Sequence, residues 1–222
     1  YFQDQSIAII PARGGSTRIK NKNLQKVGGT SLLKNSLIAC KESNLFKEII
    51  VSTDSLDIAN ESEDFASIVH KRSKVTSSSI SSTESVISEV INDLPKLFTE
   101  RTLIYLIQCT SPFLTEKDLK ESFNIIRNKN YDYSCLIAGY FTKKFIWMKN
   151  AETNIWEPIN YIPNKRPRSQ DHESLFIENG AFYAFGLSNF ILTKCRIHGE
   201  VDVFSMEELR SIDIDEKADL DY

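Results

Sequence analysis

The feature that most constrains this chain is a repeated alternation of short apolar runs with stretches of helical periodicity. Residues 6–11 (SIAIIP) form an apolar, largely β-branched run, and residues 30–43 (TSLLKNSLIACKES) then carry apolar side chains at helical spacing. The same order returns in residues 47–52 and 55–65. Strands that alternate with helices favour a parallel sheet covered by helices on both faces. The sequence therefore predicts an α/β fold.

Further elements continue the alternation. Residues 102–108 (TLIYLIQ) are almost wholly apolar, as expected of a strand buried on both faces. Ser81 and Glu84 have capping-box spacing, which predicts a helix start. The other predicted elements are strands at residues 66–70, 133–139, 176–185 and 211–215, a helix beginning at Thr115, and a short helix capped by Ser188.

Regular periodicity is absent from residues 140–175, which are rich in Lys, Asn, Pro and aromatic residues. Prolines interrupt the segment at Pro158, Pro163 and Pro167. We interpret it as an extension of short strands and long loops. It would be inserted into a single domain made of residues 4–139 and 176–222.

Composition excludes several classes of function. Lys and Arg number 27 against 30 Asp and Glu, a net charge of −3, which argues against nucleic acid or an anionic membrane as a partner. No apolar run approaches membrane-spanning length, and no secretion signal opens the chain. Tyr1-Phe2-Gln3 resembles the end of a protease-cleavable tag and is set aside. The four cysteines show no metal-ligand spacing, so we expect a protein of the reducing cytoplasm.

Ligands of open parallel sheets bind beyond the carboxyl ends of the strands, which directs attention to the loop after residues 6–11. This loop reads ARGGSTRIKNKN, with Gly14 and Gly15 able to bring the backbone close to an anion. Its cations are Arg13, Arg18, Lys20 and Lys22. A polyphosphate is the favoured ligand, and a solvated surface loop is the alternative. The loop matches neither G-x-x-x-x-G-K-[ST] nor G-x-G-x-x-G, so P-loop and dinucleotide-dehydrogenase functions lose most of their support.

Two aspartates near the end of the chain suggest a cation site. Asp213 and Asp215 alternate with Ile212 and Ile214, so on a strand both carboxylates would project from one face while the isoleucines enter the core. Such a pair suits Mg²⁺, which takes one or two carboxylates and completes its shell with waters and phosphate oxygens. The alternative is a pair of ordinary solvated aspartates on an exposed strand.

Several motifs occur in an order that points to one family. They are IIPARGGSTRIKNKN at residues 9–23, IIVSTD at 49–54, a basic and then serine-rich segment at 71–85, LIQCTSPFLT at 106–115, RPRSQD at 166–171, ENGAFY at 178–183 and SIDID at 211–215. Together they resemble the CMP-sialic acid synthetases (acylneuraminate cytidylyltransferases), a family that includes CMP-legionaminic and CMP-pseudaminic acid synthetases. The resemblance covers nearly the whole chain.

This resemblance implies a Rossmann-like three-layer nucleotidyltransferase fold and a homodimer, with the extension at residues 140–175 reaching toward the partner's active site. The implied reaction joins CTP to a nonulosonic acid of the sialic acid type, giving a CMP-sugar and pyrophosphate with Mg²⁺ or Mn²⁺ as cofactor. Two positions depart from the family. Thr17 stands where most sialate synthetases carry lysine, with Arg18 next to it to supply the charge. Lys143-Lys144 replaces a frequent His-Pro, which bears on the identity of the sugar more than on the reaction.

The resemblance also implies roles for individual residues. The catalytic residues would be Lys22, Arg13, Asp213 and Asp215, of which the two aspartates hold the metal. The nucleotide-binding residues would be Arg13, Gly14, Gly15, Ser16, Arg18, Lys22, Asn23, Arg72, Ser82 and Gln108. The sugar-binding residues would be Gln108, Arg168, Gln170, Asn179 and Tyr183. A synthetase for the eight-carbon acid sugar of lipopolysaccharide (the CMP-KDO type) and a catalytically silent nucleotide-binding relative remain alternatives.

Overall fold

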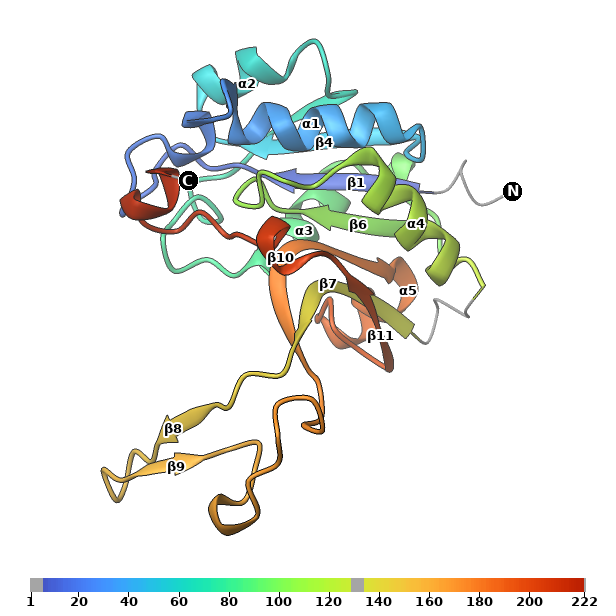
Figure 1. Cartoon of the computed structure of the whole chain (residues 1–222). Helices are drawn as coiled ribbons and strands as arrows, with labels where there is room; N and C mark the ends of the chain where they lie inside the picture. The colour runs from blue at the N-terminus through green and yellow to red at the C-terminus, as the bar shows by residue number, and fades with distance from the viewer. Residues whose placement is uncertain (1–5, 129–133, 222) are drawn as a thin grey trace.

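The computed structural model describes residues 6–128 and 134–221, so that residues 1–3 and the predicted strand start at Tyr133 lie outside the described residues. Seven strands form the central sheet in the order β11-β7-β10-β6-β1-β4-β5 (Figure 1). The strands are β1 (Ser6–Pro11), β4 (Glu48–Thr53), β5 (Ile68–Lys71), β6 (Leu103–Ile107), β7 (Ser134–Thr142), β10 (Leu175–Gly186) and β11 (Glu200–Ser205). The helices are α1 (Leu32–Ser43), α2 (Leu56–Ser62), α3 (Thr83–Asp93), α4 (Glu116–Ile126) and α5 (Leu187–Thr193).

The sheet is parallel except at one strand. β1 runs parallel to β4 and β6, β4 parallel to β5, and β11 parallel to β7. β10 lies between β6 and β7 and runs antiparallel to both. The prediction of a mostly parallel sheet within an α/β fold is therefore confirmed.

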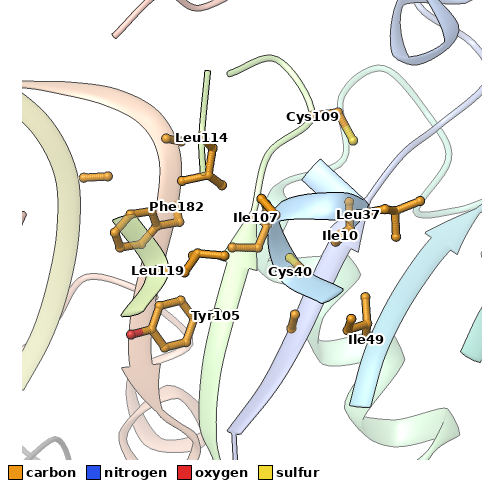
Figure 2. Close-up of a cluster of buried hydrophobic side chains, with 14 of the residues drawn as sticks. Ile10, Leu37, Cys40, Ile49, Tyr105, Ile107, Cys109, Leu114, Leu119 and Phe182 are labelled. Atoms are coloured by element: carbon orange, nitrogen blue, oxygen red, sulfur yellow. The ribbon is translucent and has the colours of Figure 1, made fainter. Parts of the chain in front are cut away.

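Both faces of the sheet are covered, which makes three layers. Ile10 of β1 is fully buried in a cluster with Leu37 of α1 and Leu119 of α4, shown in Figure 2. On the opposite face Ile9 is buried in a cluster that includes Ile87 of α3 and Phe190 of α5. Successive strand residues point to opposite faces, so an apolar run such as β1 supplies both clusters.

Segments outside the sheet complete the chain. Short 3-10 helices and two-residue strands occur at η2 (Lys22–Leu24), β2 (Lys26–Val27), β3 (Thr30–Ser31), η3 (Pro95–Leu97), η4 (Pro163–Lys165), η5 (Glu208–Arg210) and η6 (Lys217–Asp221). Strands β8 (Trp147–Lys149) and β9 (Trp156–Pro158) pair antiparallel in an arm that extends away from the sheet, as Figure 1 shows. This arm, residues 143–174, falls within the segment predicted to lack a regular period. No helix in the described ranges combines the length and the apolar character needed to cross a bilayer.

Predictions for two helix starts were wrong. Helix α3 is capped by Ser82, whose hydroxyl accepts a hydrogen bond from the Ser85 amide, so the Ser81–Glu84 capping box does not form. Helix α5 is preceded by Gly186 without a side-chain cap, and the Ser188 hydroxyl donates to the carbonyl of Glu100 instead. By contrast, Thr115 forms a complete capping box with Asp118 at the start of α4.

Two strand assignments also differ from the structure. Residues 211–215 were predicted to be a strand, but they form an irregular segment after η5. Ile214 is nevertheless buried, and its amide donates to the carbonyl of Thr110 at 2.8 Å. The alternation of apolar and polar residues thus predicted the burial of Ile214 correctly, but its prediction of a strand was wrong. Strand β11 was missed because it is a short edge strand with acidic residues, Glu200 and Asp202, among its valines.

Candidate functional site

A cleft of about 450 Å³ lies beyond the carboxyl ends of β1 and β6. Its walls are the loop after β1, the serine-rich segment that leads from β5 into α3, the start of the loop after β6, and Asp215. The predicted site residues that line it are Arg13, Ser16, Arg18, Lys22, Asn23, Arg72, Ser82, Gln108 and Asp215. The position of this cleft agrees with the general rule for ligand sites in open parallel sheets.

The loop after β1 and the end of the chain meet in this cleft. Lys22 Nζ donates to Asp215 Oδ1 at 2.8 Å and to the carbonyl of Ile214 at 2.7 Å. Arg18 Nη1 lies 3.1 Å from Asp215 Oδ2. Figure 1 shows the C-terminal segment beside the N-terminal loop. Two cations and a carboxylate therefore converge at one wall of the cleft.

The two aspartates have opposite electrostatic environments. The hydrogen bond and charge of Lys22, together with the charge of Arg18, hold the pKa of Asp215 below its ordinary value despite partial burial. Burial raises the pKa of Asp213, the charge of Asp215 adds to this, and a hydrogen bond with Thr110 opposes it. Asp213 does not line the cleft and remains exposed as a residue. The prediction that both carboxylates project from one strand face was wrong because no strand forms there.

Two further arginines, Arg13 and Arg72, also line the cleft. Arg13 Nη1 donates to the carbonyl of Ser78 at 3.2 Å, which connects the loop after β1 to the serine-rich segment. Arg72 is 6% exposed yet contributes to the cleft lining. Burial lowers the pKa of Arg72, and the carboxylates of Asp54 and Glu89 oppose this. An arginine remains protonated under such conditions, so both groups present positive charge.

Other predicted nucleotide-binding residues form hydrogen bonds within the protein. The Asn23 amide is buried and donates to the carbonyl of Arg13 at 3.0 Å, which holds the loop in shape. The Gly14 amide donates to Asp54 Oδ1 at 2.8 Å, so it is already engaged by a carboxylate. Neither Gly14 nor Gly15 belongs to the cleft lining. Ser82 lines the cleft while its hydroxyl caps α3.

A corner of β10 approaches the cleft next to Gln108. A Cβ built on Gly180 would lie 2.7 Å from Gln108 Oε1, so the two residues are in close contact. Asn179 beside it is buried, and its amide donates to Ser211 Oγ at 3.0 Å and contacts the Met206 sulfur. Asn179 therefore joins β10 to the segment that leads to Asp215.

The remaining predicted sugar-binding residues lie away from the cleft lining. Arg168 and Gln170 are exposed on the arm. Tyr183 is buried against the core, its hydroxyl donates to Glu178 at 3.0 Å, and the Arg196 guanidinium lies 4.4 Å from its ring centre. Their assignment to the sugar stays a prediction.

Sequence reasoning missed several residues of the cleft. Thr76, Ser78 and Ser79 line it, although the serine-rich segment had been noted only as a motif. A run of serines between a strand and a helix is the signal that could have identified them, because hydroxyls and helix N-termini both suit anions. Asp54, which does not line the cleft but accepts from the Gly14 amide, was also missed, and its position after a buried strand was the available signal.

A family model described as "Cytidylyltransferase" matches residues 7–222. The chain belongs to this family. It is 32% identical to N-acylneuraminate cytidylyltransferase A of Danio rerio over 97% of its own length and 48% of that protein. It is 27% identical to the pseudaminic acid cytidylyltransferase of Campylobacter jejuni, over 98% of the chain and 94% of that protein.

Solved structures show the same fold. A CMP:2-keto-3-deoxy-manno-octonic acid synthetase complexed with CTP superposes with a TM-score of 0.66 at 15% identity, covering 98% of this chain and 95% of that one. The chain spans about half the length of the fish relatives it matches. The predicted resemblance to CMP-sugar synthetases is thus confirmed as membership of the cytidylyltransferase family and similarity to the named relatives.

Proposed function

We propose that this member of the cytidylyltransferase family activates a nonulosonic acid of the sialic acid type, converting CTP and the sugar into a CMP-sugar and pyrophosphate. The observation that carries the proposal is the meeting of Lys22 and Arg18 with Asp215 in a cleft that also receives Arg13 and Arg72. Four cations around one small cleft suit a triphosphate. The named relatives act on sialic and pseudaminic acids, which supports this sugar class.

In the proposed reaction the anomeric hydroxyl oxygen forms a bond to the α-phosphorus as the bond from that phosphorus to the pyrophosphate oxygen breaks. Pyrophosphate departs with the bonding electrons, and water accepts the hydroxyl proton. Catalysis of this kind depends on positioning and charge stabilisation. Lys22 would offset charge on the α-phosphate, while Arg13 and Arg72 hold the leaving phosphates.

We further propose that Asp213 and Asp215 hold Mg²⁺ or Mn²⁺. Their hard oxygen donors suit such a cation. Partial burial, and to a lesser extent the charge of Asp215, raises the pKa of Asp213, and a bound cation would offset both effects. No cluster of three or more His, Cys, Asp or Glu occurs in the described ranges, so substrate phosphates and waters would have to complete the coordination. When bound, the ion would neutralise phosphate charge.

The arm provides the basis for a proposed homodimer. Trp147 and Trp156 are 47% and 60% exposed on the β8–β9 hairpin, and apolar surface of this kind marks interfaces. In this arrangement Arg168 and Gln170 of the arm would bind the sugar in the partner's cleft. We also expect a cytoplasmic location, since the cysteines at 40, 109, 135 and 195 are free thiols.

Pyrophosphate release in the presence of Mg²⁺ and CTP, with each acid sugar supplied separately, tests the proposal. Sialic, legionaminic or pseudaminic acid should be consumed, and mass spectrometry should detect the corresponding CMP-sugar. Turnover of the eight-carbon sugar alone would favour the CMP-KDO type. CTP binding without turnover of any sugar would identify a silent relative and contradict the proposed activity.

A further inference from the structure

A chain of buried polar groups runs behind Arg72. Ser52 is the penultimate residue of β4, and His70 lies opposite it on β5 in the parallel register. Ser52 Oγ lies 3.1 Å from His70 Nδ1, and His70 Nε2 lies 3.0 Å from Asp93 Oδ2 on α3. Arg72 donates from Nε to Ser52 Oγ at 3.3 Å and from Nη2 to the Ser52 carbonyl at 3.0 Å. Four side chains, one each from β4, β5 and α3 and one from the residue that follows β5, are thus linked in series.

The two ends of this hydrogen-bonded chain are compatible with one direction of donation throughout. Arginine only donates hydrogen bonds and an ionised carboxylate only accepts them. Ser52 Oγ therefore accepts from Arg72, and its own hydrogen is available for His70 Nδ1. His70 in turn donates from Nε2 to Asp93. A neutral imidazole with its proton on Nε2 satisfies every member of the chain.

The same three residues, serine, histidine and aspartate, form the nucleophilic triad of many hydrolases, but burial excludes that role here. Ser52 is 0% exposed and His70 is 6% exposed, so no substrate carbonyl or phosphate reaches the hydroxyl. Arg72 is the member of the chain that lines the cleft. Any functional effect of Ser52, His70 and Asp93 must consequently pass through Arg72.

We propose that Ser52, His70 and Asp93 are positioning residues that orient the Arg72 guanidinium toward the nucleotide phosphates. This inference rests on the proposed function, since it needs a phosphate ligand in the cleft. Two arginine donors are used by Ser52, which leaves the remaining N–H groups for the cleft. A planar guanidinium binds phosphate well only in a defined orientation, so fixing its plane strengthens binding.

A double-mutant cycle on CTP affinity tests the proposal. Ser52→Ala should raise the CTP dissociation constant and KM about tenfold, the loss expected for a hydrogen bond to a charged group, while kcat changes little. In an Arg72→Ala background the same substitution should have no further effect. Ser62→Ala is the matched control, because this serine is equally buried and its hydroxyl donates to the Ile58 carbonyl within α2.

Asp93→Ala provides a second variant that perturbs folding less, since the Asp93 side chain is 55% exposed. It should weaken CTP binding about threefold, and Asp93→Asn should restore affinity because its amide oxygen still accepts a hydrogen bond. Unchanged affinity in Ser52→Ala and Asp93→Ala would overturn the proposal. So would equal losses of affinity with and without Arg72, because these would indicate a general structural role.

Nitrogen NMR of the His70 ring tests the hydrogen-bonded chain of side chains in the absence of nucleotide. The Nε2–H tautomer is expected, and Arg72→Ala should shift the Nδ1 signal through Ser52. A proton on Nδ1, or an Nδ1 signal that does not change in Arg72→Ala, would contradict the proposed direction of the hydrogen bonds. If these NMR results hold but the wild-type protein does not bind CTP, the proposed function fails, and the role of the chain in nucleotide binding fails with it.

Discussion

Asp215 is the carboxylate that lines the cleft in the described part of the chain, and it faces both Lys22 and Arg18. Asp215→Asn keeps the size of the side chain but removes its charge. Turnover should fall by a factor on the order of 10², because a lost metal ligand removes several kcal/mol of charge stabilisation. Steady-state kinetics measures this effect. Asp57→Asn on α2 is the control, and near-normal turnover of Asp215→Asn would refute the metal role.

The opposite pKa shifts of the two aspartates predict opposite effects on stability. The lowered pKa of Asp215 means that its ionised form stabilises the fold above the ordinary aspartate pKa and loses this contribution as the pH falls through the lowered value. The raised pKa of Asp213 means that its contribution is favourable in acid and is lost as the pH rises through the raised value. At neutral pH Asp215→Asn should therefore lower the melting temperature and Asp213→Asn should raise it.

Asp213 is exposed and the Asp215 side chain is half exposed, so each shift in melting temperature should be small, about 2 °C at neutral pH. The difference between the wild type and each variant should shrink as the pH falls toward 3. Thermal melts from about pH 3 to pH 8 measure these differences. Shifts of the same sign in both variants would contradict the assigned environments.

Gly180 combines a left-handed backbone with close contact to Gln108. Its φ is +72°, and an added Cβ would displace the Gln108 amide. Gly28 has a similar φ of +62° with open space around it. Alanine at either position should cost about 1 kcal/mol of backbone strain, but only Gly180→Ala should lower kcat/KM, by about tenfold or more. Equal kinetics of the two variants would show that Gln108 tolerates the displacement.

At the scale of elements, one ion pair attaches the segment that carries Asp215 to α4. Arg210 of η5 bonds to Asp118 and to the carbonyl of Phe113, and Asp118 is almost fully buried at the start of α4. Arg210→Gln should lower the free energy of unfolding by about 1–3 kcal/mol, the value of hydrogen bonds to charged groups. Turnover should also fall, because the segment that leads to Asp215 would no longer be held against the start of α4. Chemical denaturation and kinetics measure the two effects.

Lys117→Gln is the control for this prediction. Lys117 pairs with Glu121 on the same helix at 3.8 Å, and both side chains are exposed, so little stability should be lost. If Arg210→Gln proves as mild as the control, the ion pair does not hold the segment in place.

Comparison of particular elements explains what sequence patterns could reveal. The apolar runs at β1, β4 and β6 were recognisable because strands buried on both faces need no alternation. At residues 211–215 the pattern was misleading. Alternating burial arises in any extended segment that packs one side against the core, whether or not the segment pairs as a strand. The capping-box signal succeeded at Thr115 and failed at Ser81, where the next serine competes for the same helix start.

The site was predictable where its residues lie in one loop and unpredictable where contacts are tertiary. Arg18 and Lys22 of the loop after β1 and the aspartate at 215 were identified, and the structure brings these three together. Lys20 does not line the cleft. The hydrogen-bonded chain from Asp93 to Arg72 was not foreseen. Its members come from β4, β5, the residue after β5 and α3, and no sequence spacing relates them. Only the register of two strands places Ser52 opposite His70.

At the scale of the whole molecule, the arm should determine the oligomeric state. Replacing both Trp147 and Trp156 with serine should convert a dimer into a monomer, since aromatic residues at an interface commonly contribute about 2 kcal/mol each. Sedimentation or light scattering measures this, and turnover should fall with dissociation. Leu192→Ser on α5 is the control, because this residue is 80% exposed but lies outside the arm. A monomeric wild-type protein would contradict the proposed dimer.

The bond between Lys22 and Asp215 spans 193 positions of the chain. During translation the cationic loop leaves the ribosome long before its carboxylate partner has been synthesised. Strands β1, β4 and β5 are successive strands of the central sheet both along the sequence and in sheet order, so they are able to pair early. The wall formed by Asp215, however, awaits the synthesis of all seven strands of this sheet. The scaffold is therefore made before the cleft is closed.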